Sequence, residues 1–167
     1  PLTVIADLES LWTLPADELR AGLGEVIKCG WIEDPRILQL TKEPEKLLDP
    51  SSAELREAII SSISVKARIV TEDFKESGSR EFLNYGHTLA HAIEKVENFT
   101  VRHGEAVAIG CVYAAALARE CGMGDRVDEP IESFSAVGLP VTYEKGNRQA
   151  LVDAMFSDKK VRAGRLR

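Results

Sequence analysis

The stretch FLNYGHTLAHAIEKVENFTVRHGEAVAIGCVYAAALA, residues 82–118, indicates the kind of fold this chain forms. Its final part, residues 106–118, is almost wholly apolar. That run is shorter than the roughly 20 residues needed to cross a bilayer, so we interpret it as a helix buried in a globular core. The histidine-containing part before it predicts a second helix.

Helix start signals recur along the rest of the chain. Pro15 with two acids in the next turn predicts one start, and Asp34-Pro35 predicts another. Ser51 and Glu54 match the S-x-x-E capping box of a long helix that runs to about Glu72. The expected helices cover residues 15–32, a segment from 35, and residues 51–72, 83–97, 104–121, 128–137 and 148–156, with Gly138-Leu139-Pro140 as a stop signal.

Strand-like sequence is confined to the two ends. Residues 1–7, PLTVIAD, resemble the tail of a strand, and residues 159–167, KKVRAGRLR, resemble a turn leading into one. We therefore predict an all-α, multi-helical fold with minor β structure at the ends. The 167 residues suffice for one domain, residues 1–167. Because neither end resembles a domain boundary, we expect a fragment of a longer protein.

Composition narrows the class of protein. Hydrophobic residues make up 44% and charged residues 29%, as in ordinary globular domains. The net charge of −6 argues against nucleic acid or an anionic membrane as the main partner. No leader or membrane span is recognisable, so we expect a cytoplasmic location. The three cysteines, Cys29, Cys111 and Cys121, form no CxxC pair and are expected to be reduced and packed.

The long helix contains one anomaly. Leu55, Ile59, Ile63 and Val70 define an apolar stripe at helical spacing, and Lys66 falls in its middle. A lysine directed into a buried face is unfavourable unless it is paired or binds an anion. Two interpretations stay open: its ammonium reaches water along the apolar surface, or it faces a cleft.

All three histidines of the chain lie within 17 residues. His87 and His91 share one face of the expected helix, with Glu94 one turn further, and such an i,i+4 pair commonly presents two nitrogens to zinc. His103 precedes the apolar helix, so its ring can point back toward the pair. Spacing alone allows a metal to take any two of the three plus a carboxylate from elsewhere. The alternative is that they are hydrogen-bonded residues of a helical core.

A candidate carboxylate is Glu25, in the apolar, glycine-flanked stretch LRAGLGEVIKCG, residues 19–30. The glycines suggest close approach of another group to the backbone, whereas a pair with Lys28 would be an ordinary surface salt bridge. The segment KESGSREFLNYGHT, residues 75–88, leads into His87. It supplies donors for a phosphate or carboxylate and an acid–base group near the histidines, namely Lys75, Glu76, Arg80 and Asn84.

Four segments closely resemble, in order, motifs of the C-terminal domain of the 3-dehydroquinate synthase family. They are AGLGEVIKCG (21–30), SVKARIVTEDFKESGSREFLNYGHTLAHAIE (64–94), HGEAVAIG (103–110) and DKKVRAGRLR (158–167). Mild departures are Tyr85, where phenylalanine is commoner, and Ala90, where glycine is commoner. The resemblance implies a helical domain that holds a divalent metal, Zn²⁺ or Co²⁺. NAD would be bound mainly by an N-terminal Rossmann-like domain that is absent from this chain.

The resemblance also implies roles for individual residues. The metal ligands would be Glu25, His87 and His103. His91 would be a catalytic, substrate-contacting imidazole, and Glu76 a proton acceptor. Substrate would be bound by Lys28, Lys66, Arg80, Asn84 and either Lys159 or Lys160. NAD would be contacted by Ser10, Leu11, Trp12 and Thr13.

The reaction implied is the conversion of 3-deoxy-D-arabino-heptulosonate 7-phosphate, a phosphorylated sugar acid, to 3-dehydroquinate and phosphate in the shikimate pathway. The enzyme would be an NAD- and metal-dependent lyase, a homodimer when full-length, and this fragment is expected to be inactive alone. Three alternatives stay open. They are a related sugar-phosphate cyclase, a metal-dependent alcohol dehydrogenase of similar build, and a non-catalytic helical domain.

Overall fold

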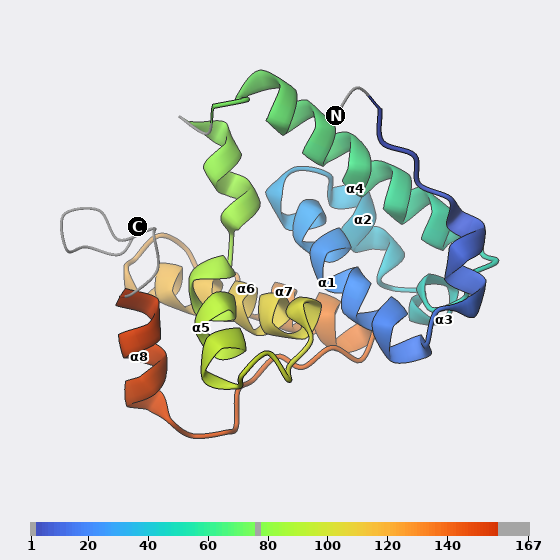
Figure 1. Cartoon of the computed structure of the whole chain (residues 1–167). Coiled ribbons are helices and arrows are strands. Elements are labelled where there is room, and N and C mark those ends of the chain that lie inside the picture. Colours follow the sequence, from blue (N-terminus) through green and yellow to red (C-terminus); the bar gives the residue numbers. More distant parts are fainter. Residues whose placement is uncertain (1–2, 76–77, 157–167) are drawn as a thin grey trace.

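The computed structural model describes residues 3–75 and 78–156, and within these ranges all regular structure is helical (Figure 1). The 3₁₀-helices are η1 (Leu8–Thr13) and η2 (Ser79–Asn84). The α-helices are α1 (Ala16–Ile32), α2 (Pro35–Leu40), α3 (Pro44–Leu47), α4 (Ala53–Glu72), α5 (His87–Val96), α6 (His103–Glu120), α7 (Asp128–Ala136) and α8 (Arg148–Phe156). The all-α prediction is confirmed. Residues 3–7, expected to end a strand, form none, since no partner strand is available to them in the described part.

Most helices begin where the start signals predicted. Pro15 and Asp34 are the N-cap residues of α1 and α2, and the Asp34 carboxylate accepts from the Arg36 amide at 3.1 Å. The long helix is capped one residue later than predicted. The Ser52 hydroxyl, not that of Ser51, accepts from the Leu55 amide. With Ser52 as the N-cap residue, Glu54 is not at the third helical position that a capping box requires, and its carboxylate accepts from Lys46.

The helix expected from residue 83 begins only at His87. Residues 79–84 form η2 instead, and Gly86 then adopts a left-handed conformation with φ of 77°. Glycine tolerates this backbone, which ends the 3₁₀ segment and starts α5 in a new direction. As a result, His87 is the first residue of its helix.

The apolar stripe predicted for α4 is not its buried face. The buried residues are Leu55, Ala58, Val65 and Ile69, whereas Ile63 is 47% exposed. Lys66 is therefore on the solvent side of the helix. The buried residues also follow helical spacing, so the sequence of α4 offers two possible apolar faces. The packing of α4 against α1 and α2 buries the face that contains Val65 and Ile69.

The core is organised around α6, which packs between α5 and α1 and also contacts α7 (Figure 1). Its first half is fully buried over residues 106–111. Cys111 lies in this buried part and Cys29 is buried in α1, but Cys121 is exposed just beyond the end of α6. The expectation of a packed thiol is therefore wrong for Cys121. No helix in the described ranges is long and apolar enough to cross a membrane.

Two contacts to α6 are so close that only glycine fits. A Cβ on Gly24 would overlap with the backbone of Gly104, and a Cβ on Gly104 would overlap with the carbonyl group of Ala21. At the second contact, a Cβ on Gly110 would overlap with the carbonyl group of Gly86. The close approach expected at the glycines around Glu25 therefore occurs at Gly24, where the approaching group is the backbone of α6, but not at Gly22, which has nothing within 4 Å.

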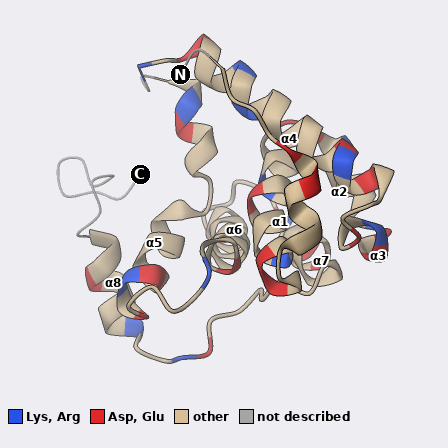
Figure 2. Ribbon diagram, turned by 45° about the vertical axis from the view of Figure 1, so that its right-hand side comes forward, with Lys and Arg blue, Asp and Glu red and all other residues tan. Residues whose placement is uncertain are grey.

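Charges are mixed over the surface of the molecule. Acidic and basic residues alternate along α4, and acids cluster at the start of α1 (Figure 2). Arg102, just before α6, pairs with Glu18 of α1 at 2.7 Å and with Glu105 at 3.3 Å. This pairing adds a polar connection between the starts of α1 and α6.

Candidate metal centre

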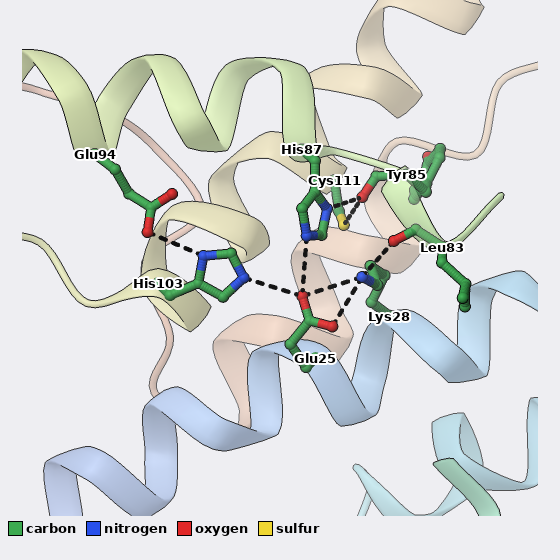
Figure 3. Close-up of polar contacts among 8 residues, drawn as sticks. All are labelled: Glu25, Lys28, Leu83, Tyr85, His87, Glu94, His103 and Cys111. Carbon is green, nitrogen blue, oxygen red and sulfur yellow. Dashed lines mark hydrogen bonds and ion pairs between the residues drawn. The ribbon is translucent and has the colours of Figure 1, made fainter. Parts of the chain in front are cut away.

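Three side chains from three helices converge on one point. Glu25 comes from α1, His87 from the first residue of α5 and His103 from the first residue of α6 (Figure 3). The Nε2 atom of each histidine lies 3.3 Å from Glu25 Oε1. One potential ligand atom from each residue lies within 4.8 Å of the others. Two imidazoles and one carboxylate are the protein ligands of many catalytic zinc sites, which keep a further position open.

The close helix contacts explain this convergence. Glu25 follows Gly24, His87 follows Gly86 and His103 precedes Gly104. These glycines are the residues at which α1 and α5 meet α6 backbone to backbone. The side chains next to these glycines, those of Glu25, His87 and His103, are therefore brought close together.

The second nitrogen of each converging histidine has its own acceptor. His87 Nδ1 lies 3.2 Å from the Tyr85 carbonyl oxygen, and His103 Nδ1 lies 3.0 Å from Glu94 Oε1. An imidazole that donates from Nδ1 leaves the lone pair of Nε2 free. That tautomer would leave both Nε2 lone pairs available to an ion held beside Glu25, whereas without an ion a proton on His87 Nε2 hydrogen-bonds to the Glu25 carboxylate.

Lys28 is buried beside Glu25, with 2% of its surface exposed. Its ammonium donates to both oxygens of Glu25, at 3.0 and 2.9 Å, and to the Leu83 carbonyl oxygen at 2.6 Å. The pair is thus not the surface salt bridge considered from sequence. All three donors of the ammonium are occupied by protein acceptors.

The Glu25 carboxyl group is ionised in this environment. Burial would raise its pKa, but the hydrogen bond with His87 and the charge of Lys28 outweigh burial and lower the pKa to about 2. A carboxylate must be ionised to bind a metal. Glu25 therefore meets this requirement across the neutral pH range.

His91 lies next to this cluster without facing Glu25 in the same way. Its ring centroid is 5.2 Å from that of His87 and 6.4 Å from that of His103. The group of converging ligand atoms contains His103 in its place. The i,i+4 pair suggested by spacing is therefore not the pair that meets Glu25, because α6 delivers the second imidazole.

The other predicted substrate-binding residues in the described ranges belong to α4 and η2. Lys66 is an exposed residue of α4. Arg80 is in η2, where its guanidinium donates to the Phe74 carbonyl oxygen at 3.0 Å. Asn84, half-buried, ends η2 directly after Leu83, whose carbonyl oxygen meets Lys28.

Seven other predicted site residues lie elsewhere or are not described. Glu76, Lys159 and Lys160 fall outside the described residues. Residues 10–13 belong to η1, and Leu11 and Trp12 line a groove against the start of α4 that contains none of the histidines. Trp12 is 65% exposed.

Sequence reasoning missed three contributors to the cluster. Glu94 was placed on the histidine face but received no role, although it follows His87 by seven residues, which is two helical turns. The carbonyl groups of Leu83 and Tyr85 carry no sequence signal, because every residue has one.

The sequence comparisons agree with the motifs. Residues 22–161 match a family model described as 3-dehydroquinate synthase C-terminal. A 3-dehydroquinate synthase from Arthrobacter sp. (strain FB24) is 52% identical over 170 residues, which is 100% of this chain and 47% of that protein. The chain thus spans about half the length of the curated relatives it matches.

Two solved structures share the fold. ValA, the 2-epi-5-epi-valiolone synthase from Streptomyces hygroscopicus subsp. jinggangensis 5008 with NAD⁺ and Zn²⁺ bound, superposes with a TM-score of 0.80 at 21% identity, over 89% of this chain and 43% of that chain. A 2-deoxy-scyllo-inosose synthase complexed with carbaglucose-6-phosphate, NAD⁺ and Co²⁺ has a TM-score of 0.77 at 26% identity, over 93% and 44% of the two chains.

Proposed function

Because the chain belongs to the 3-dehydroquinate synthase family, we propose that it forms the metal- and substrate-binding domain of such an enzyme. The full enzyme would convert 3-deoxy-D-arabino-heptulosonate 7-phosphate to 3-dehydroquinate and phosphate, as an NAD- and metal-dependent lyase. The observation that carries this proposal is the convergence of Glu25, His87 and His103. It occurs in a chain that is 52% identical to a 3-dehydroquinate synthase.

The donor set fits Zn²⁺ or Co²⁺. Two imidazoles present Nε2, and an ionised carboxylate faces both of them. Related cyclase structures contain these two ions. When bound here, the ion would act as a Lewis acid that lowers the pKa of a substrate hydroxyl group.

The remaining residues would bind the substrate and move protons. His91 lies beside the ligand cluster and is proposed to exchange a proton with the substrate, with Glu76 as a second proton acceptor. Lys66, Arg80, Asn84 and one of Lys159 and Lys160 would bind the phosphate and carboxylate groups. The Lys28 ammonium already donates three hydrogen bonds, to Glu25 and to the Leu83 carbonyl oxygen, so a direct contact with substrate would break one of them. Lys28 would therefore hold Glu25 and η2 in place.

NAD is proposed to bind mainly to the half of the family's proteins that this chain does not match. The relatives are about twice as long as this chain, and both related cyclase structures contain NAD⁺. Ser10, Leu11, Trp12 and Thr13 would contact the cofactor from this side. The groove beside Trp12 supports such a contact because it exposes an aromatic ring.

A related sugar-phosphate cyclase is the second candidate, supported by the two structural neighbours. A domain exchange separates the candidates: this chain replaces the matching 170 residues of the Arthrobacter relative, and the chimera is assayed with NAD and Zn²⁺. We expect phosphate release and 3-dehydroquinate from the heptulosonate 7-phosphate, and none from a heptulose phosphate without the carboxylate. The same chimera with Glu25→Ala is the control. Activity only on the heptulose phosphate without the carboxylate would favour the second candidate.

A further inference from the structure

We infer that Glu94 is the positioning residue that orients His103 toward the metal. This inference rests on the proposed metal site. His103 Nδ1 lies 3.0 Å from Glu94 Oε1, and His103 Nε2 lies 3.3 Å from Glu25 Oε1 (Figure 3). The imidazole is therefore held between two carboxylates, one at each nitrogen.

The two carboxylates have different places in the site. Glu25 Oε1 also lies 3.3 Å from His87 Nε2, so Glu25 faces both imidazoles. Glu94 meets the nitrogen of His103 that points away from this meeting point (Figure 3). Glu94 thus acts through His103 rather than as a metal ligand.

His103 requires such a partner more than His87 does. The His87 side chain is 11% exposed, and its Nδ1 meets a backbone carbonyl group two residues earlier. The His103 side chain is 46% exposed and stands at the first residue of α6. Besides its contacts with the rings of His87 and His91, this half-exposed ring is oriented on the Nδ1 side by the hydrogen bond to Glu94.

Glu94 is itself well fixed. Its side chain is only 13% exposed, although it carries a charge. Its backbone carbonyl oxygen accepts from the Phe99 amide at 2.7 Å, which closes the end of α5. The sequence of α5 therefore supplies one ligand, His87, and two turns later the support for the other ligand.

The chemical consequence concerns the protonation of His103. A carboxylate at Nδ1 favours the tautomer that donates from Nδ1 and makes Nε2 a stronger donor to a metal ion. Loss of such partners typically weakens metal binding by about 10–100-fold. We expect Glu94→Ala to weaken Zn²⁺ binding within this range at unchanged stoichiometry. Glu94→Gln keeps an acceptor oxygen and is expected to lose less.

The test measures Zn²⁺ affinity by competition with a chromophoric chelator in the purified protein and its variants. Glu97→Gln is the matched control, because Glu97 ends the same helix but bonds to Tyr143 and Lys145. We expect this control to bind Zn²⁺ within about twofold of the wild type, well below the loss typical of a histidine partner. Imidazole ¹⁵N NMR of the zinc-loaded wild type should show His103 bound through Nε2 with its proton on Nδ1, and binding through Nδ1 would contradict the inference.

The outcomes separate this inference from the proposed function. Circular dichroism and thermal midpoints of the metal-free proteins identify a variant that has lost its fold. In that case the tautomer of His103 in the wild type still tests the positioning role of Glu94. If Glu25→Ala abolishes Zn²⁺ binding but Glu94→Ala binds as tightly as the wild type, the positioning role is wrong and the metal site stands. If the wild type binds no Zn²⁺, the metal site and the positioning role are both wrong.

Discussion

His87 and His91 are one helical turn apart, but their surroundings differ. Nε2 of His87 faces Glu25 and its Nδ1 faces a carbonyl group, so both of its nitrogens are committed. His91 stands beside this pair, 5.2 Å away between ring centroids, and is outside the converging ligand group. The proposed metal ligand and the proposed catalytic imidazole are thus neighbours on one helix face.

Substitution of the two histidines should separate these tasks. His87→Ala removes a ligand, so Zn²⁺ affinity should fall by more than about 100-fold, beyond the loss typical of a supporting residue. His91→Ala should leave the affinity within a few-fold of the wild type and impair turnover of the domain-exchanged enzyme. Zinc titration and product assays of the same preparations check both statements. Equal loss of zinc in the two variants would show that His91 is a ligand.

The stabilisation that comes from the hydrogen bond between Tyr143 and Glu97 should depend on pH. The Tyr143 hydroxyl donates to Glu97 at 2.5 Å, and this bond raises the pKa of Tyr143 to about 12 while it lowers the pKa of Glu97. The folded pKa of Tyr143 exceeds its ordinary value of 10.0, so the stabilisation is fully present below that pH and is lost as the pH rises through about 12. On the acid side it is lost as the pH falls through the lowered pKa of Glu97.

The measurement is ¹³C NMR of labelled tyrosine across the alkaline range, with Tyr143→Phe to assign the resonance. Glu97→Gln should bring the midpoint of Tyr143 down toward 10.0, because the carboxylate no longer accepts its proton. An unchanged midpoint in this variant would mean that the bond to Glu97 does not control the ionisation.

At the scale of helices, the contact between α1 and α6 depends on the absence of a side chain. Gly24 and Gly22 lie in the same helix two residues apart, yet a Cβ at Gly24 meets the backbone of Gly104, and one at Gly22 meets nothing within 4 Å. The two positions therefore form a natural pair for substitution.

Gly24→Ala should lower the free energy of unfolding by about 1–3 kcal/mol or more, because backbone atoms cannot move aside without separating the helices. It should also weaken Zn²⁺ binding, since Glu25 would move away from His103. Gly22→Ala should raise the free energy of unfolding by about 0.5–1 kcal/mol, as alanine restricts the unfolded chain and favours helix. Urea denaturation of both variants, with and without Zn²⁺, compares them. Similar effects at the two positions would contradict the close contact.

At the scale of the whole molecule, the proposed ligands connect helices that are far apart in the sequence. Glu25 comes from α1, whereas His87 and His103 come from helices that begin more than 60 residues later. A metal bound to all three stabilises the native state alone, because the unfolded chain does not bring them together.

Zinc should therefore raise the thermal midpoint of the wild type. At 100 times the dissociation constant the stabilisation is about 2.7 kcal/mol, or roughly 5–10 °C for a domain of this size. Scanning calorimetry with Zn²⁺ and with a chelator measures the shift. Glu25→Ala should show none, and an equal shift in this variant would indicate that zinc binds elsewhere.

Much of this molecule can be predicted from local sequence. Pro15, Asp34 and Gly138 act on the few residues around them, so they place helix ends to within a residue or two. The resemblance to the family's motifs, and not local spacing, implied Glu25, His87 and His103 as ligands, and these residues converge. Short-range steric and hydrogen-bonding preferences depend only on adjacent residues, so they can be predicted without knowledge of long-range contacts.

Features that depend on distant contacts were not predictable in this way. Helical spacing allowed two stripes of α4, and packing against α1 and α2 buried the one without Lys66. The sequence suggested that Lys28 forms a surface salt bridge, whereas in the structure it is buried and donates to the Leu83 carbonyl group, 55 positions away. The choice of His103 over His91 as the partner of Glu25 follows from backbone contact at Gly104. Burial and orientation are set by whichever residues the folded chain places opposite, and periodicity within one helix does not identify them.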